Sequence, residues 1–304
     1  MSRPTCEICA KYQGKIYCIS GKDKRFPALF ETALRSGYAL MHPNCRHEFI
    51  PVWLELMDEK ELAAEIDRSK ISPQADTRSQ KERDLYAEWQ AEHRQRYSEQ
   101  QYFNQAKQTL GSAMPYKDIG AFRRSYRSKE GSFAHQRSHN LIRDYKQLQS
   151  YREELGRASL PKTLENYQKI VYNKSDKNNF DHYIDVRRKG NISAVVSFSD
   201  WQDMYTRLKT IFVGQTATNG LKITGVSQHF VDRTIGTIYL KDDNKKREGV
   251  SIKDIQKVVF NGIVGRTKKD SFGRNSTLLY IDNVADVTIN TETGVLIQCN
   301  PNSK

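Results

Sequence analysis

The sequence has no long run of apolar residues. Only 37% of its 304 residues are hydrophobic, and no window approaches the roughly 18 consecutive apolar residues that a membrane helix requires. The opening stretch, MSRPTCEICAKYQGK, has no apolar core of the kind that a signal peptide carries. We therefore expect no membrane partner.

Cysteine is scarce and odd in number. The chain has 5 cysteines, and all but Cys299 come before residue 46. This distribution does not resemble the disulfide framework of a small secreted protein. A reducing cytoplasm, or a particle assembled in one, fits better. The chain also lacks internal repeats, low-complexity tracts and a Gly-Lys-Ser/Thr phosphate loop.

Acidic residues are outnumbered by basic ones. The formal net charge is +13 and the pI is about 9.4. Such a balance favours anionic partners such as nucleic acid, and it is equally compatible with a basic protein that binds nothing anionic.

Composition divides the chain into three sections. Residues 1–57 combine Gly and Pro with aromatic residues and clustered Cys and His, and they predict a small Cys/His module. Residues 58–160 are rich in Glu, Gln, Lys and Arg in helical patterns with sparse apolar positions. They predict a polar helical spacer or arm that packs on a partner. Residues 161–304 have the apolar content of a separate globular domain.

The last section predicts an α+β fold. SIKDIQKVVF places its apolar residues on one helical face, and Ser251 with Asp254 forms a capping-box-like start. The period then changes to two in TLLYID, ADVTIN and GVLIQCN, as in strands, and TETG joins the last two as a hairpin. Helices followed by strands predict a small antiparallel sheet with helices packed on it.

Cysteine and histidine cluster in the N-terminal module. Cys6 and Cys9 form C-x-x-C, and the stretch MHPNCRHEF contains His42, Cys45 and His47. Thiolates and imidazoles at such spacings can hold one tetrahedral zinc ion. We expect Cys6, Cys9, Cys45 and His47 as structural ligands, with His42 as an alternative to His47 and Cys18 as a further candidate. The alternative is a small core of reduced side chains.

The same stretch resembles a known family. TCEICAKYQGKIY, FPALF and LMHPNCRHEF, within residues 3–51, resemble the C-terminal signature of tailed-phage head-morphogenesis (minor capsid) proteins. The resemblance implies a location in the virion and phage capsid or portal components as partners. The long helical domain that usually precedes this signature is missing, which places a portal-binding role in doubt.

Residues 161–304 resemble a phage toxin-like nuclease family of the barnase–EndoU–colicin–RelE superfamily. The resemblance is carried by LPKTLENYQKIVYN, VRRKGNISAVVSF, FVGQTATNGLKITGVSQHFVDRTIG, REGVSIKDIQKVVFN and ADVTINTETGVLIQCNP. It implies metal-independent cleavage of RNA, such as tRNA or another cellular RNA, in the host bacterial cytoplasm. A cognate immunity protein is a further implied partner.

The residue chemistry of this section agrees with phosphate handling. His229 and Arg233 are four residues apart and share one face of a helix. An imidazole can serve as acid or base, and a guanidinium can clamp two phosphate oxygens. Asp232 is placed to orient the imidazole. The other histidines of the helical segments, His135, His139 and His182, have polar sequence neighbours and are expected at the surface.

The strands predict the remaining site. Ala285, Val287 and Ile289 are expected on the core face, and Asp286, Thr288 and Asn290 on the other. Leu296 is expected on the same face as Gln298 and Asn300. A polar face of Thr288, Asn290, Gln298 and Asn300 is expected to bind a phosphate or a base. The predicted catalytic residues are His229, Arg233, Arg274, Tyr280 and Thr288. The predicted RNA-binding residues are Lys222, Ser276, Asn290, Gln298 and Asn300. The alternative is that these residues have no catalytic or binding role and form a solvated polar sheet face with an exposed histidine.

Two functions from different classes compete. The first is a phage-encoded endoribonuclease effector carried on a capsid-associated module. The second is a structural virion or head-morphogenesis protein whose C-terminal module binds nucleic acid or a partner without catalysis. An ADP-ribosyltransferase toxin ranks last, because the sequence lacks the arranged Arg, Ser-Thr-Ser and Glu-x-Glu motifs.

Overall fold

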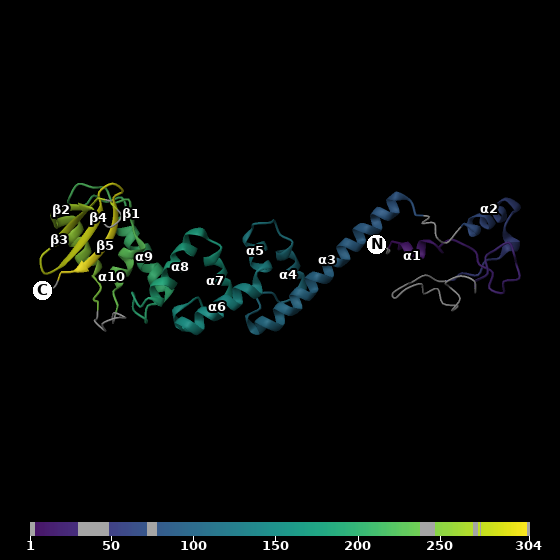
Figure 1. Cartoon of the computed structure of the whole chain (residues 1–304), viewed down its shortest axis with the longest axis horizontal. Helices are drawn as coiled ribbons and strands as arrows, with labels where there is room; N and C mark the ends of the chain where they lie inside the picture. The colour runs from purple at the N-terminus through teal and green to yellow at the C-terminus, as the bar shows by residue number, and fades with distance from the viewer. Residues whose placement is uncertain are drawn as a thin grey trace. The chain divides into compact units, whose positions relative to one another are not determined.

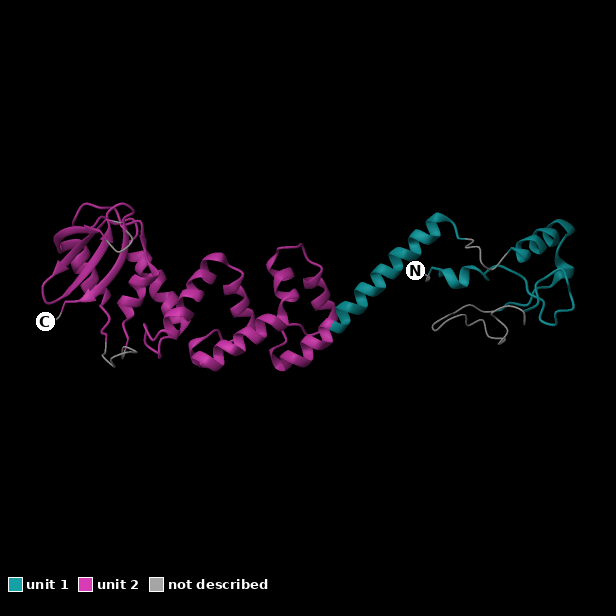
Figure 2. Cartoon of the chain, in the orientation of Figure 1, with its two compact units in different colours: residues 1–101 teal, residues 102–304 magenta. Residues whose placement is uncertain are grey.

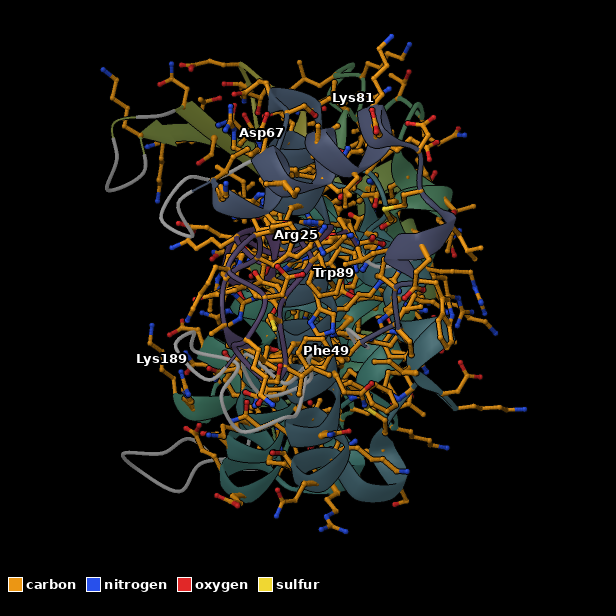
Figure 3. All side chains as sticks on the ribbon, turned by 90° about the vertical axis from the view of Figure 1, so that its right-hand side faces the viewer. Arg25, Phe49, Asp67, Lys81, Trp89 and Lys189 are labelled. Atoms are coloured by element: carbon orange, nitrogen blue, oxygen red, sulfur yellow. The ribbon has the colours of Figure 1, made fainter. Side chains whose placement is uncertain are left out.

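A computed structural model describes residues 4–29, 49–71, 78–237, 247–269, 273 and 275–302. By its internal contacts the chain forms two compact units, residues 1–101 (unit 1) and residues 102–304 (unit 2) (Figure 2). Figure 1 labels the helices and strands. Among the described residues, no helix is both long and apolar enough to cross a membrane.

Unit 1 is a small helical module. Its elements are α1 (Glu7–Ala10), the 3₁₀ turn η2 (Leu54–Leu56), α2 (Glu59–Lys70) and the first part of α3 (Gln80–Leu110). A capping box starts α2, because Asp58 accepts from the amide of Glu61 and the Glu61 carboxylate accepts from the amide of Asp58. Ser69 Oγ accepts from the amide of Ile16 at 2.9 Å, which ties α2 to the segment after α1.

Unit 2 begins with a succession of helices. They are the remainder of α3, η3 (Gly111–Ala113), α4 (Ile119–Tyr126), α5 (Phe133–His139), α6 (Leu141–Leu155), η4 (Arg157–Ser159), α7 (Leu164–Val171), α8 (Lys174–Arg188) and α9 (Phe198–Phe212). Side chains cap several of these helices at their N-termini, which explains where they start; Asp118, Thr163 and Ser197 are three such caps.

A five-stranded sheet completes unit 2. Its strands are β1 (Gly225–Val226), β2 (Ile263–Lys269), β3 (Asn275–Ile281), β4 (Ala285–Asn290) and β5 (Val295–Pro301), in the order β1-β5-β4-β3-β2. All neighbours are antiparallel except β1 and β5. Two more helices, α10 (Gln228–Ile235) and α11 (Ile252–Asn261), pack on it. The predicted α+β class is confirmed.

The two faces of the sheet differ. The core face carries Ala285, Val287 and Ile289, which are completely buried as predicted. The opposite face, called the polar face here, carries Tyr280 of β3, Asp286 and Thr288 of β4, and Gln298 and Asn300 of β5, all of them half-buried.

A bulge resets the alternation of β5. Leu296 and Cys299 are both completely buried although they are three residues apart. The ladder between β4 and β5 shifts between Thr288 and Ile289, so that Ile289 pairs with Leu296 whereas Val287 pairs with Cys299. The expectation that Leu296 shares a face with Gln298 and Asn300 is therefore wrong.

One apolar core runs through the whole of unit 2. Phe122 and Leu141, within the predicted spacer, are completely buried in the same cluster as Trp201 and Val287. Asp144 of α6 accepts from Gln168 of α7 at 2.9 Å, across the predicted boundary at residue 160. Residues 102–160 thus pack on the C-terminal part of their own chain, and the three-domain division remains a prediction.

Candidate functional site

Helix α10 is fixed against β5 by its first residues and its apolar face. The hydroxyl of its N-cap, Ser227, accepts from the amide of Phe230 and donates to the carbonyl oxygen of Ile297 at 2.8 Å. Phe230 and Val231 are completely buried. The helix ends at Gly236, whose φ of 75° lies in the region that favours glycine. The opposite side of α10 is left to carry polar groups.

His229 and Arg233 lie on one face of α10, as their spacing predicts. Arg233 Nε donates to Nε2 of His229 at 3.4 Å, and Arg233 Nη1 donates to Oδ1 of Asn300 at 3.3 Å. The helix therefore directs both side chains toward the end of β5. Because Nε2 accepts, the imidazole carries its proton on Nδ1 in this arrangement.

A row of polar groups continues from Asn300 across the sheet. Asn300 Nδ2 donates to Oδ1 of Asp286 at 2.9 Å, and Asp286 pairs with Tyr280 on the next strand. Thr288 and Gln298 pair with each other in the neighbouring row of the polar face. The predicted residues Tyr280, Thr288, Gln298 and Asn300 thus share this face with the side chain of Arg233 at its edge.

Asp232 does not orient His229. It is buried with 2% of its surface exposed, and its carboxylate accepts from Nε2 of His182 at 2.8 Å and from Nε1 of Trp201 at 2.9 Å. The helical position after Val231 faces α8 and α9, so the carboxylate points into the unit. The expected orienting role is therefore wrong.

The histidines expected at the surface are also held by neighbours. His182 keeps 23% of its side chain exposed and contacts Asp232. His135 and His139 are half-buried, with their rings stacked 4.1 Å apart, and the His139 ring stacks on Tyr126 at 3.7 Å. Aromatic side chains from other helices contact His139 and His182, and the polar sequence around these histidines does not reveal it.

Arg247 is a site residue that the sequence interpretation missed. The pKa of His229 is affected by four charged neighbours. It is lowered by Arg233, Arg247 and His182 and raised by Asp232. Arg247 is half-buried, and its guanidinium donates to the carbonyl oxygen of Asn191. Burial lowers its pKa, and the nearby Arg233 lowers it further. Two guanidinium groups near one imidazole form a strongly cationic corner, which favours an anionic ligand.

Two glycines bring Arg247 to α10. A Cβ on Gly249 would lie 2.3 Å from the carbonyl oxygen of Thr234, and a Cβ on Gly236 would lie 2.4 Å from the amide nitrogen of Gly249. Only glycine permits this backbone approach. A backbone bridge between Thr237 and Arg247 follows directly. This glycine pair, at Gly236 and Gly249, is the one sequence signal that could have indicated Arg247.

The electrostatics favour the neutral form of His229. Its pKa is lowered from the ordinary value, first because its neighbours desolvate the ring, although the residue as a whole is exposed, and second because Arg233 lies beside it. A neutral imidazole at neutral pH can accept a proton from a hydroxyl group.

The predicted RNA-binding residues divide between the two ends of the sheet. Asn300 lies beside Arg233, whereas Ser276 pairs with Asn290 at the other end of β4, next to the hairpin turn. Exposed Lys222 lies beside Gly294 of the same turn. Asn300 pairs with Asp286 and Ser276 with Asn290, four residues further along β4, which is about 13 Å at roughly 3.3 Å per residue. Lys222 and Ser276 therefore lie at the hairpin end of the sheet, away from the contact of Arg233 with Asn300.

Asn290 serves the hairpin turn. It is buried, and its Oδ1 accepts from the amides of Glu292 and Thr293 at 2.9 and 2.8 Å. The expectation that Asn290 offers a polar surface together with Thr288 is therefore wrong, because the turn occupies its side-chain oxygen.

Cys299 is an unreactive, buried cysteine. It lies under α10, where Thr234 Oγ1 is 3.5 Å from its sulfur. Burial raises the pKa of its thiol to about 12, so it is protonated at neutral pH and is no nucleophile.

Four predicted residues lie outside the described residues: Arg274, Cys45, His47 and the alternative ligand His42. The first two zinc ligands, Cys6 and Cys9, are buried on either end of the first turn of α1 and pack against Tyr86. The amide of Cys9 donates to the sulfur of Cys6 at 3.4 Å. Within the described ranges no three Cys, His, Asp or Glu residues gather, and the zinc site remains a prediction.

Comparisons with known proteins bear on the N-terminal part. Residues 3–135 match the family model of phage minor capsid protein 2. The predicted minor-capsid resemblance is confirmed, and it extends beyond residue 51 into the polar helices. The match covers less than half of the chain. Comparisons with curated proteins and with solved structures gave no match.

Proposed function

We propose that the chain is a phage minor capsid component whose C-terminal part is a metal-independent endoribonuclease. The observation that carries the nuclease proposal is the contact of Arg233 with both His229 and Asn300. The capsid proposal rests on the family match of residues 3–135.

The cationic corner suits the chemistry of RNA cleavage. Attack of a 2′-hydroxyl on the adjacent phosphorus needs a base for the hydroxyl proton, and His229 is the neutral imidazole of the site. The phosphate gains negative charge as the bond forms, and Arg233 and Arg247 supply two guanidinium groups for that charge. Tyr280 and Thr288 on the polar face contact the neighbouring nucleotide in this scheme.

The N-terminal part would carry the enzyme. Residues 3–135 associate with phage capsid or portal components, and the Cys/His module holds structural zinc while catalysis uses no cofactor. The chain then travels in the virion and acts on RNA, such as tRNA, in the host bacterial cytoplasm. A cognate immunity protein protects the cell that produces it.

Incubation of the full chain with total RNA and with tRNA, in the presence of a chelator, tests this function. We expect fragments with 2′,3′-cyclic phosphate ends from the parent chain and none from His229→Ala. A parent chain that leaves RNA intact contradicts the nuclease.

The structural alternative is favoured by the family match itself. A chain that binds RNA or a head component without cutting RNA, and whose binding is unchanged by His229→Ala, would support a head-morphogenesis role for the whole molecule.

A further inference from the structure

A buried carboxylate connects three helices behind the candidate site. Asp232 of α10 accepts from His182 of α8 at 2.8 Å and from the indole of Trp201 of α9 at 2.9 Å. Trp201 is completely buried and stacks on Tyr205. The carboxylate is therefore held on one side by a fixed donor, and its other oxygen fixes the imidazole.

The position of His182 is fixed by contacts between α8 and α10, in addition to its hydrogen bond with Asp232. Gln228, at the start of α10, donates to Oδ1 of Asn179 at 3.0 Å and to the carbonyl oxygen of Asn178 at 3.2 Å, so α8 is tied to α10 one turn before His182. All hydrogen bonds of His182 within the described ranges go through Nε2. The side chain of His182 is 23% exposed, and its Nδ1 makes no hydrogen bond within the described ranges.

The two imidazoles of the site have opposite partners. His229 has guanidinium groups nearby, whereas His182 has a carboxylate. A carboxylate behind an imidazole fixes its orientation and stabilises the imidazolium that forms during proton transfer.

We propose that His182, positioned by Asp232, is the general acid that protonates the leaving 5′-oxygen in the RNA cleavage proposed above. This inference rests on the proposed function and adds the second proton-transfer group that such a reaction needs.

The step balances with these two histidines alone. The guanidinium of Arg233 turns from Nε2 of His229 to the phosphate, which frees the one nitrogen of the ring that carries no proton. The 2′-oxygen forms a bond to phosphorus as its proton passes to this Nε2 of His229. The bond between phosphorus and the 5′-oxygen breaks with its electron pair on that oxygen, which receives the proton of the His182 imidazolium. The products are a 2′,3′-cyclic phosphate and a 5′-hydroxyl.

A matched pair of substrates isolates the acid. Both are DNA oligonucleotides with a single ribonucleotide, so that only one linkage can be cut, and in one of them sulfur replaces the leaving 5′-oxygen. A thiolate leaves without protonation because thiols are much stronger acids than alcohols. A general acid therefore matters for the oxygen substrate and hardly for the sulfur substrate.

We expect His182→Ala in the full chain to slow cleavage of the oxygen substrate by on the order of 10²–10⁴ and that of the sulfur substrate by less than about tenfold. His229→Ala should slow both. Asp232→Asn keeps an acceptor for Trp201 and should repeat the His182→Ala pattern more weakly. His135→Ala, at a half-buried histidine of α5, is the control and should slow neither.

The outcomes separate the two proposals. Equal slowing of both substrates by His182→Ala, or no slowing, overturns the acid role and leaves the nuclease standing. A parent chain that cuts neither substrate overturns the nuclease and the acid role together. If His182→Ala melts at a much lower temperature, His182→Gln provides the same comparison in a chain that keeps a hydrogen-bond donor for Asp232.

Discussion

Arg233 lies one helical turn after His229, and its guanidinium contacts both the imidazole and Asn300 of β5. The guanidinium thus lies between helix and sheet, and in the proposed reaction it binds the phosphate there. The fork of two N–H groups, and not the charge alone, makes that contact.

Arg233→Ala should lower kcat for RNA cleavage by on the order of 10², the typical loss when one transition-state donor is removed. Arg233→Lys should recover only part of this, because lysine keeps the charge and loses the fork. Steady-state kinetics on a single-ribonucleotide substrate measure both. Arg207→Ala, at an exposed arginine of α9, is the control and should leave the rate unchanged. Equal rates for Arg233→Ala and the parent would remove the phosphate role.

His229 should make the fold sensitive to acid. Its folded-state pKa is lowered from the ordinary value of 6.5, so the unfolded chain binds more protons than the folded chain below that value. Stability therefore falls as the pH drops below about 6.5 and gains nothing further above it. Melting temperatures from pH 8 to pH 5 should fall more for the parent than for His229→Gln. Parallel curves for the two chains would contradict the lowered pKa.

Gly249→Ala should destabilise unit 2, since its Cβ would lie 2.3 Å from the carbonyl oxygen of Thr234 and 2.6 Å from that of Ile235. Overpacking of this kind costs about 1–3 kcal/mol. Gly225→Ala is the matched control, because its Cβ meets only Val295 at an ordinary 3.5 Å. Chemical denaturation of both variants checks the difference. If the two variants are equally stable, the glycine pair does not fix Arg247.

The apolar core that continues through unit 2 predicts which truncated fragments of the protein fold stably. Residues 102–304 should unfold cooperatively, whereas residues 161–304 should unfold at a lower denaturant concentration, because Gln168 and Tyr172 lose Asp144. Equal midpoints for the two fragments would support an independent domain that starts at residue 161.

Metal analysis tests the N-terminal module. We expect about one zinc per chain, lost in Cys6→Ser and Cys45→Ser, since three thiolates and an imidazole suit a structural zinc site. If the metal is retained in Cys45→Ser and lost in Cys18→Ser, then Cys18 is the zinc ligand in place of Cys45. A parent chain without metal, with unchanged folding in chelator, would favour the reduced core.

Local periodicity predicted much of the fold and part of the site. The spacing of His229 and Arg233, and the alternation that buries Val287 and Ile289, follow from the geometry of one helix and one strand. The alternation prediction failed at Leu296, where a bulge adds one residue to the ladder.

Contacts between distant segments were beyond such reasoning. Asp232 and His182 are 50 residues apart, and only the packing of α8 on α10 brings them together. Arg247 reaches the site through the approach of Gly236 and Gly249, which no spacing rule encodes.

The position of Cys299 allows its chemical modification to report the opening of unit 2. It is the only cysteine among residues 102–304, and it is completely buried between β5 and α10. A thiol reagent can reach it only when α10 lifts from the sheet, so the rate at which this sulfur is modified measures how often the candidate site opens. In the same chain, Cys18 has a pKa below its ordinary value because Ser20 hydrogen-bonds its sulfur, and its faster reaction provides the internal reference.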